Sequence, residues 1–191
     1  MKVVAFNGSP RRNGNTSMLI KTVIEVLEGQ GIETETVQLG GQPVRGCLAC
    51  YKCFENKDRH CAQTKDLLND CIDRMLAADG IILGSPTYFA CMTPETKALI
   101  DRAGMVSRAN EMMFKRKVGA AVVAARRAGA VHTFDSINHF FTIGEMLIPG
   151  ASYWNVGFGR NEGEVENDAE GLATMKSLGE NMAWLIKKIT A

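Results

Sequence analysis

Short apolar segments that alternate with amphipathic segments constrain this chain more than any other feature of its sequence. The segments predicted to be strands cover residues 3–6, 32–39, 80–84, 117–125 and 152–158, of which 32–39 is predicted from its Thr and Val content rather than from an apolar run. The amphipathic segments repeat apolar residues at helical spacing, and they cover 65–78, 131–147, 172–189 and the stretches that begin at residues 15 and 93. This alternation predicts right-handed crossovers and a parallel sheet with helices on both faces. Two doubly wound strand orders are common for such a sheet, and the alternation does not choose between them.

Length and charge narrow the classes of protein that this chain can be. Its 191 residues suffice for one well-buried domain, so we predict a single domain over 1–191 with a cysteine-rich insert at about 40–64. The 22 basic and 21 acidic residues form no basic run, which argues against nucleic acid or a membrane as a partner. The sequence has no signal-like start and no apolar run that could cross a bilayer, so we expect a cytoplasmic protein.

A polar loop, residues 8–17, follows the first predicted strand and leads into the first predicted helix. The free N–H groups and the dipole of a helix start favour an anion such as phosphate. The same residue types are also common in an ordinary polar turn with a helix cap, where Asn15 would be the cap. The candidate phosphate-binding residues are Ser9, Arg11, Asn15, Thr16 and Ser17.

A second loop, residues 84–90, follows the third predicted strand. Pro86 and Tyr88 offer flat apolar surface to a ring system, and backbone N–H groups there can reach polar atoms of the ring. The alternative is a turn whose aromatic side chains fill the core, an interpretation that suits Phe89 best. The candidate ring-binding residues are Pro86, Thr87, Tyr88 and Phe89.

Three stretches in this order resemble the NADPH-dependent FMN reductase family. They are Gly8-Ser9-Pro10-Arg11 through Asn15-Thr16, then Ser85-Pro86-Thr87-Tyr88, then Lys97 through Asp101-Arg102. The resemblance covers nearly the whole chain and implies an α/β, flavodoxin-like three-layer sandwich whose five parallel strands run in the order 2-1-3-4-5. It also implies bound FMN, with the phosphate and ring on the two residue sets named above. The implied reaction is NAD(P)H-driven reduction of flavin, quinone, metal or another acceptor.

The loop after the fourth predicted strand departs from that family pattern. Members often carry glycines there, whereas this chain has Arg126 and Arg127. Their charge can stabilise a reduced, anionic flavin or recognise the 2′-phosphate of NADPH. A pair of solvated side chains is the alternative for either arginine.

Four of the six cysteines fall in a short stretch after the second predicted strand. Three have C-x₂-C-x₂-C spacing and the fourth follows after seven residues, which resembles the compact motif of the iron–sulfur flavoproteins, a branch of the same superfamily. That resemblance implies a [4Fe–4S] cluster, although structural zinc uses the same ligands and unligated thiols are a third interpretation. We interpret Cys71 and Cys91 as packing thiols. The candidate ligands are Cys47, Cys50, Cys53 and Cys61.

These patterns predict an FMN-dependent oxidoreductase that uses NAD(P)H and needs no protein acid or base as a catalytic residue, because the cofactor carries the chemistry. The alternative is an iron–sulfur flavoprotein that carries electrons from ferredoxin without NAD(P)H activity of its own. A zinc-stabilised binding protein is a third hypothesis. The expected partners are a small-molecule or protein electron acceptor and further copies of the chain, as a dimer or tetramer.

Overall fold

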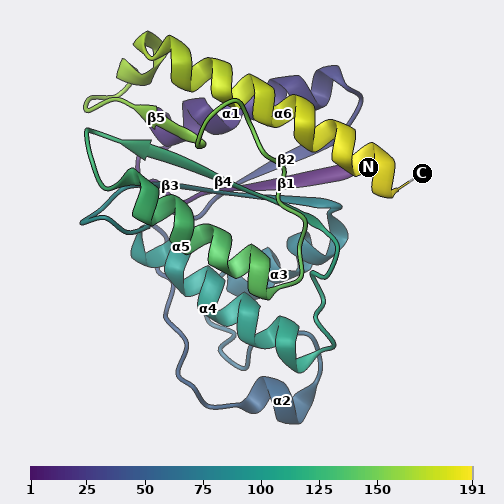
Figure 1. Ribbon diagram of the computed structural model, residues 1–191. Coiled ribbons are helices and arrows are strands. Elements are labelled where there is room, and N and C mark those ends of the chain that lie inside the picture. Colours follow the sequence, from purple (N-terminus) through teal and green to yellow (C-terminus); the bar gives the residue numbers. More distant parts are fainter. Residues whose placement is uncertain (191) are drawn as a thin grey trace.

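The computed structural model describes residues 1–190 and contains one five-stranded sheet whose neighbouring strands are all parallel (Figure 1). The strand order is β2-β1-β3-β4-β5, which confirms the predicted flavodoxin-like order. Because β1 and β3 are neighbours, the chain changes direction across the sheet between them, and the loops after both strands meet at one edge. The strands are β1 (Lys2–Asn7), β2 (Glu33–Gln38), β3 (Gly80–Pro86), β4 (Val118–Ala125) and β5 (Val156–Phe158).

Helices cover both faces of the sheet and complete the predicted three layers (Figure 1). α1 and α6 pack together on one face, whereas α3, α4 and α5 cover the other. A short helix, α2, lies apart from the sheet, beyond α4. The helices are α1 (Asn15–Gly29), α2 (Lys52–Asn56), α3 (Leu68–Ala77), α4 (Pro94–Ala109), α5 (Ala130–Ile143) and α6 (Ala169–Ile189), and a 3₁₀ turn spans Glu164–Asn167.

Each face of the sheet has its own apolar core, because successive residues of a strand point to opposite sides. Val3 belongs to the core beneath α1 and α6, and its neighbour Val4 belongs to the core beneath α3, α4 and α5. Every residue of β4 is buried. This explains why β1, β3 and β4 are nearly continuous apolar runs, whereas β2, at the edge of the sheet, has polar residues and buries none of them. None of the helices within residues 1–190 combines the length and the apolar character that crossing a bilayer requires.

Some predicted boundaries were wrong. α5 ends at Ile143 rather than at residue 147, because Gly144 caps it and Leu147 returns to pair with Val118. The fifth strand pairs with β4 only from Val156 onward, after a turn. The insert at 40–64 contains α2, which buries none of its residues and therefore has no apolar periodicity from which it could be predicted.

Gly8 joins the first two loops at the point where the sheet changes direction. Its N–H donates to the carbonyl oxygen of Gly84 at 2.8 Å, and its own carbonyl accepts from Thr93 Oγ1 at 2.9 Å. A Cβ atom on Gly8 would lie 2.0 Å from Thr96 Oγ1, so a larger residue cannot occupy this position without moving α4. The contact fixes the loop after β1 against both β3 and the start of α4.

We expect Gly119→Ala to destabilise the fold by about 1–3 kcal/mol through overpacking. A Cβ there would lie 2.6 Å from the ring of Phe141, which is fully buried between β4 and α5. Gly104→Ala is the matched control, because its Cβ would meet Phe140 at an ordinary 3.6 Å. That change should stabilise α4 by up to about 1 kcal/mol through helix propensity. Urea unfolding at equal flavin occupancy measures both, and equal midpoints for Gly119→Ala and wild type would contradict the packing argument.

Candidate functional site

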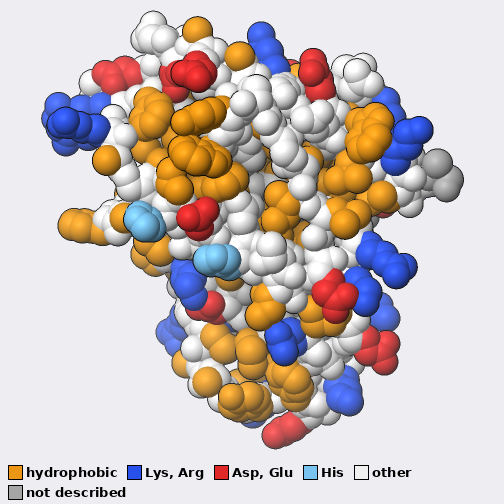
Figure 2. Space-filling view, in the orientation of Figure 1, with side chains coloured by type: hydrophobic (Ala, Val, Ile, Leu, Met, Phe, Trp, Pro, Cys, Tyr) orange, Lys and Arg blue, Asp and Glu red, His pale blue; other side chains and the backbone are white. Residues whose placement is uncertain are grey.

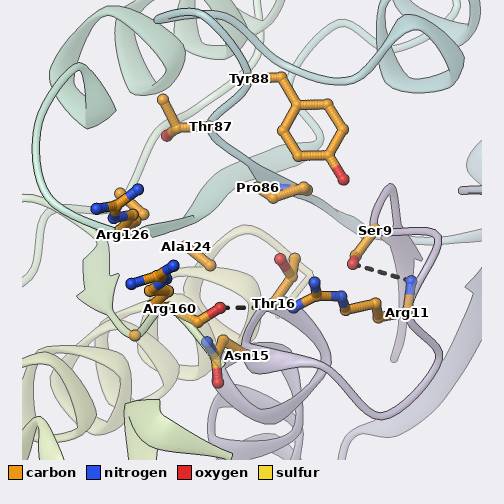
Figure 3. Close-up of a pocket in the computed structure, with 12 residues that line it drawn as sticks. Ser9, Arg11, Asn15, Thr16, Pro86, Thr87, Tyr88, Ala124, Arg126 and Arg160 are labelled. Atoms are coloured by element: carbon orange, nitrogen blue, oxygen red, sulfur yellow. Dashed lines mark hydrogen bonds between the residues drawn. The ribbon is translucent and has the colours of Figure 1, made fainter. Parts of the chain in front are cut away.

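A pocket opens at the carboxyl edge of the sheet, between the loops that follow β1, β3, β4 and β5 (Figure 3). The structure thus brings together two loops that lie about seventy residues apart in the chain, as their position on neighbouring strands predicts. Ser17, Phe89 and Arg127 do not line the pocket. The predicted residues that line it are Ser9, Arg11, Asn15, Thr16, Pro86, Thr87, Tyr88 and Arg126.

Helix α1 begins at this pocket without a side-chain cap. Its N-cap residue is Gly14, which has no side chain to offer. The first intrahelical bond runs from the Met18 N–H to the Gly14 carbonyl at 3.1 Å. The N–H groups of Asn15, Thr16 and Ser17 precede that bond and have no partner within the helix. The pocket therefore contains free backbone donors at the positive end of a helix, an arrangement that attracts anions.

The loop before α1 is held in shape by its own hydrogen bonds. The Arg11 N–H donates to Ser9 Oγ at 3.2 Å, and the Gly14 N–H donates to the Arg11 carbonyl at 3.2 Å. The Arg11 guanidinium donates to the carbonyl of Arg160 at 3.5 Å, so the loop after β5 closes the same end of the pocket (Figure 3).

Asn15 has a role that its position in the motif does not predict. It is the first residue of α1 rather than the cap, and its side chain is engaged with the loop after β5. Its Nδ2 donates to the Asn161 carbonyl at 2.9 Å, and its Oδ1 accepts from the Val165 N–H at 3.3 Å. A Cβ atom on Gly159 would lie 2.6 Å from Asn15 Nδ2. Asn15 therefore fixes one wall of the pocket.

The loop after β3 supplies the opposite, more apolar wall. Pro86 and Tyr88 face the pocket, and the Thr87 N–H donates to the Ala124 carbonyl at 2.8 Å (Figure 3). Tyr88 and Cys91 exchange backbone hydrogen bonds of 2.8 and 3.0 Å, which form a tight turn. Phe89 occupies the left-handed region in that turn, with φ of 48°, and its side chain is fully exposed. It lies neither on the pocket nor in the core.

Positive charge dominates the pocket. Arg126 and Arg11 line it as predicted, and Arg160 is a third arginine that the sequence reasoning missed. No local pattern in the sequence marks it, because the loop after β5 reaches the pocket through its contacts with Arg11 and Asn15. No Asp or Glu is among the residues that line the pocket, so its field favours an anionic ligand.

The four candidate ligands lie together at a second cavity, beside the later turns of α4. Cys47, Cys50, Cys53 and Cys61 all line it, and none is in a disulfide. Two of the sulfurs accept hydrogen bonds: Cys47 Sγ from the Ala49 N–H at 3.4 Å, and Cys61 Sγ from Arg102 Nε at 3.3 Å. As placed, no three Cys, His, Asp or Glu side chains within residues 1–190 form a ready ligand set for an ion. The structure therefore confirms that the thiols share one cavity but does not contain a preassembled metal centre.

The other two cysteines, and His60, which precedes Cys61 in the sequence, do not line this cavity. Cys71 is buried in the core, and burial raises the pKa of its thiol to about 12, so it stays protonated at neutral pH. Cys91 lies in the turn after β3. The ring of His60 lies 2.9 Å from Asp73 Oδ1. Burial also raises the pKa of the Cys53 thiol, which is half-buried, whereas Cys47 and Cys50 are exposed.

Comparisons with known proteins agree with this geometry. The family model described as NADPH-dependent FMN reductase matches residues 1–161. An iron–sulfur flavoprotein of Methanocaldococcus jannaschii is 35% identical, with 99% of both chains covered. An iron–sulfur flavoprotein of Methanosarcina thermophila is 31% identical over 99% of this chain and 97% of its own length.

Solved structures support the fold. The crystal structure of RosB with bound 8-demethyl-8-formylriboflavin-5'-phosphate superimposes with a TM-score of 0.76 at 17% identity, covering 100% of this chain and 80% of the other. At such identity the likeness concerns the fold alone, and it agrees with the strand order observed here. The match to the family model and the two relatives assign the chain to a family. The chain belongs to the NADPH-dependent FMN reductase family and is an FMN-dependent oxidoreductase.

Proposed function

We propose that the pocket at the carboxyl edge binds FMN, and that NAD(P)H reduces this flavin for onward transfer of electrons to an acceptor. The observation that carries the proposal is the uncapped start of α1, with free N–H donors and Arg11 in the same pocket as the apolar wall of Pro86 and Tyr88. FMN carries an anionic phosphate at one end and a flat ring system at the other. When bound, FMN supplies hydride acceptance at its N5 atom and release of electrons to a second substrate.

In this proposal the loop after β1 binds the phosphate of FMN. The hydroxyls of Ser9 and Thr16, the backbone N–H groups at the start of α1 and the charge of Arg11 can all meet phosphate oxygens. Ser17 contributes only its backbone N–H, because its side chain lies outside the pocket. Asn15 acts by holding the loop after β5 in place.

In this proposal the loops after β3 and β4 contact the ring system of FMN. Pro86 and Tyr88 offer flat surface, and Thr87 is tied to β4 by its backbone bond to Ala124. Arg126 adds a positive charge at this end, between Thr87 and Ala124 (Figure 3). A cation there favours the negative charge that a flavin ring gains on reduction, and it can equally attract the 2′-phosphate of NADPH.

We expect Thr16→Val to weaken FMN binding by about 1.5–3 kcal/mol, the range for a hydrogen bond to a charged acceptor. Valine keeps the methyl group of Thr16 that lies beneath Gly84, so packing is retained. Ser17→Ala is the control, since it removes a hydroxyl from the same turn of α1 that does not line the pocket. Quenching of FMN fluorescence measures both dissociation constants. A Thr16→Val value equal to that of wild type would remove this hydroxyl from the phosphate site.

Arg126→Ala and Arg127→Ala form a second matched pair. Only Arg126 lines the pocket, so only its loss should lower the flavin midpoint potential or the preference for NADPH over NADH. Spectroelectrochemistry and steady-state rates with both nicotinamides test this. If the Arg126 variant matches wild type in both quantities, its charge acts neither on the flavin nor on the nicotinamide.

We further propose that the four clustered cysteines hold a [4Fe–4S] cluster, which would relay electrons between the flavin and a partner. The support is their number and spacing, their shared cavity, their free thiols, and the donors already aimed at two of the sulfurs. Ala49 and Tyr51, between the ligands, adopt left-handed backbone with φ of 49° and 56°. Such conformations cost energy for residues with a side chain, and they persist where the surroundings require them. The relatives named iron–sulfur flavoproteins agree with this proposal.

A second candidate function is electron carriage from ferredoxin, without NAD(P)H activity of the chain itself. The surface around the clustered cysteines favours it, because the apolar side chains of Leu48 and Tyr51 are exposed there among charged residues of both signs. Exposed apolar groups of this kind are typical of protein interfaces. Rates with NADH and NADPH, compared with rates from reduced ferredoxin, separate the two functions.

We also propose a homo-oligomer in the cytoplasm. The rings of Tyr153 and Trp154 are in contact, with centroids 4.9 Å apart and an angle of 56° between their planes, and both remain exposed. Phe158 of β5 is exposed as well. Figure 2 shows apolar side chains gathered on the face that the chain crosses between α5 and β5. Exposed aromatic groups of this kind are typical of protein interfaces.

We expect about four iron and four sulfide per chain after anaerobic reconstitution of the wild type, and a large loss of both in Cys50→Ser. Cys91→Ser is the control, because Cys91 lies outside the cavity. Metal analysis and acid-labile sulfide assays provide the measurement. One equivalent of zinc without iron uptake would favour a structural metal, and no metal of either kind would leave a flavin-only reductase.

A further inference from the structure

Arg102 is the bulkiest fully buried side chain of residues 1–190, and the flavin site does not use it. It projects from the middle of α4 into the cavity that the four cysteines line. A buried guanidinium is costly unless its charge and its donors are all matched. Its partners therefore indicate what it is for.

All four hydrogen bonds of Arg102 go to the cysteine-containing insert and its exit. Nε donates to Cys61 Sγ at 3.3 Å, Nη1 to Asp66 Oδ2 at 2.5 Å and to the Arg45 carbonyl at 3.2 Å, and Nη2 to the Gln63 carbonyl at 2.7 Å. None goes to the sheet or to another helix. The guanidinium thus binds both ends of the insert, just before Cys47 and just after Cys61.

Asp66 balances the charge and extends the same network. Its carboxylate also accepts from the Arg45 N–H and the Leu68 N–H, both at 3.2 Å. These bonds and those to the two backbone carbonyls link the two ends of the insert. The bond from Nε reaches a sulfur instead, that of Cys61, which lines the same cavity as the other three cysteines.

Helix α4 connects this arrangement to the flavin pocket. Thr93 lies directly before the helix. Its N–H donates to Ser85 Oγ at 3.0 Å, and its hydroxyl donates to the Gly8 carbonyl. From Pro94 to Arg102 the helix rises about 12 Å. One helix therefore starts at a contact with the ends of β1 and β3 and carries, further along, the guanidinium that bonds to Cys61.

We propose that Arg102 is a positioning residue for the metal centre: it holds Cys61 toward the other three thiols and stabilises the more negative, reduced state of the centre through its hydrogen bond and charge. The inference rests on the proposed cluster and adds a residue that supports a ligand rather than being one. Hydrogen bonds to ligand sulfurs and nearby charge are established determinants of cluster potential. Removal of a cationic donor should therefore make the cluster harder to reduce.

The test compares three variants of the full chain, each reconstituted anaerobically with iron and sulfide. Arg102→Lys keeps a charge near Asp66 but lacks the planar fork that reaches the sulfur and the carbonyls together. Arg102→Met with Asp66→Asn removes the pair without leaving one charge buried alone. Arg108→Met is the control, because Arg108 is an exposed arginine on the same helix.

Three readouts apply to each variant: iron and sulfide content, the rate of iron loss in air, and the cluster midpoint potential from a redox titration followed by electron paramagnetic resonance. FMN content serves as the check on folding. We expect both Arg102 variants to show a more negative potential and faster iron loss, or no retained iron, with FMN content unchanged. Arg108→Met should match wild type throughout.

Iron-loaded Arg102 variants with the wild-type potential and the wild-type rate of iron loss would overturn the inference and leave Arg102 as a structural bond of the insert. That result would leave the proposed cluster intact. A wild-type chain that takes up no iron and sulfide would overturn the cluster, and the inference with it. If the double variant fails to bind FMN, it is not folded, and the cluster midpoint potential of Arg102→Lys alone tests the inference.

Discussion

The hydrogen bonds of Gly8 are the contact on which both sites depend. They join the end of β1 to the end of β3 and to the residue before α4, where the sheet changes direction. Two loops from distant parts of the chain meet because parallel strands place their carboxyl ends at one edge. Gly8 makes the meeting close, since a side chain there would collide with Thr96. The anion-binding end and the ring-binding wall of the pocket are a consequence of this single crossing.

The second site is a consequence of the helix that starts at that crossing. α4 begins beside the pocket at the carboxyl edge and, further along, contacts α2 of the cysteine-containing insert. The insert leaves the sheet at the same edge as the flavin loops, as expected for a segment that follows β2, but its thiols gather further along α4. A buried arginine and its carboxylate partner hold it there. Although burial by itself raises the pKa of Asp66, the hydrogen bonds from Arg102 and two backbone N–H groups outweigh it and lower that pKa, so the pair stays charged.

Much of this arrangement could be predicted from local sequence. Apolar runs of strand length, amphipathic repeats and the Thr93-Pro94 start of α4 are short-range signals, and the five strands and the main helices agree with them. The strand order was implied by the family resemblance rather than by these signals. The cysteine spacing predicted one set of four ligands, and the four thiols line one cavity. The predictions were poorest at the ends of elements. α5, for example, ends at Ile143, with Gly144 as its cap, because Leu147 returns to pair with Val118, and apolar periodicity carries no information about such a contact between distant residues.

The sequence by itself determined the layers and the residue types available to each site, because these follow from periodicity and from the order of elements. Only the tertiary structure decided which of two adjacent residues lines the pocket. Thr16 lines the pocket and Ser17 does not, and Arg126 lines it where Arg127 points elsewhere, since a rotation of one residue along a helix or turn redirects the side chain. Arg160 and Arg102 entered their sites in the same way. Each is an ordinary basic residue in the sequence and acquires its role from segments folded against it, which the spacing of residues along the chain cannot specify.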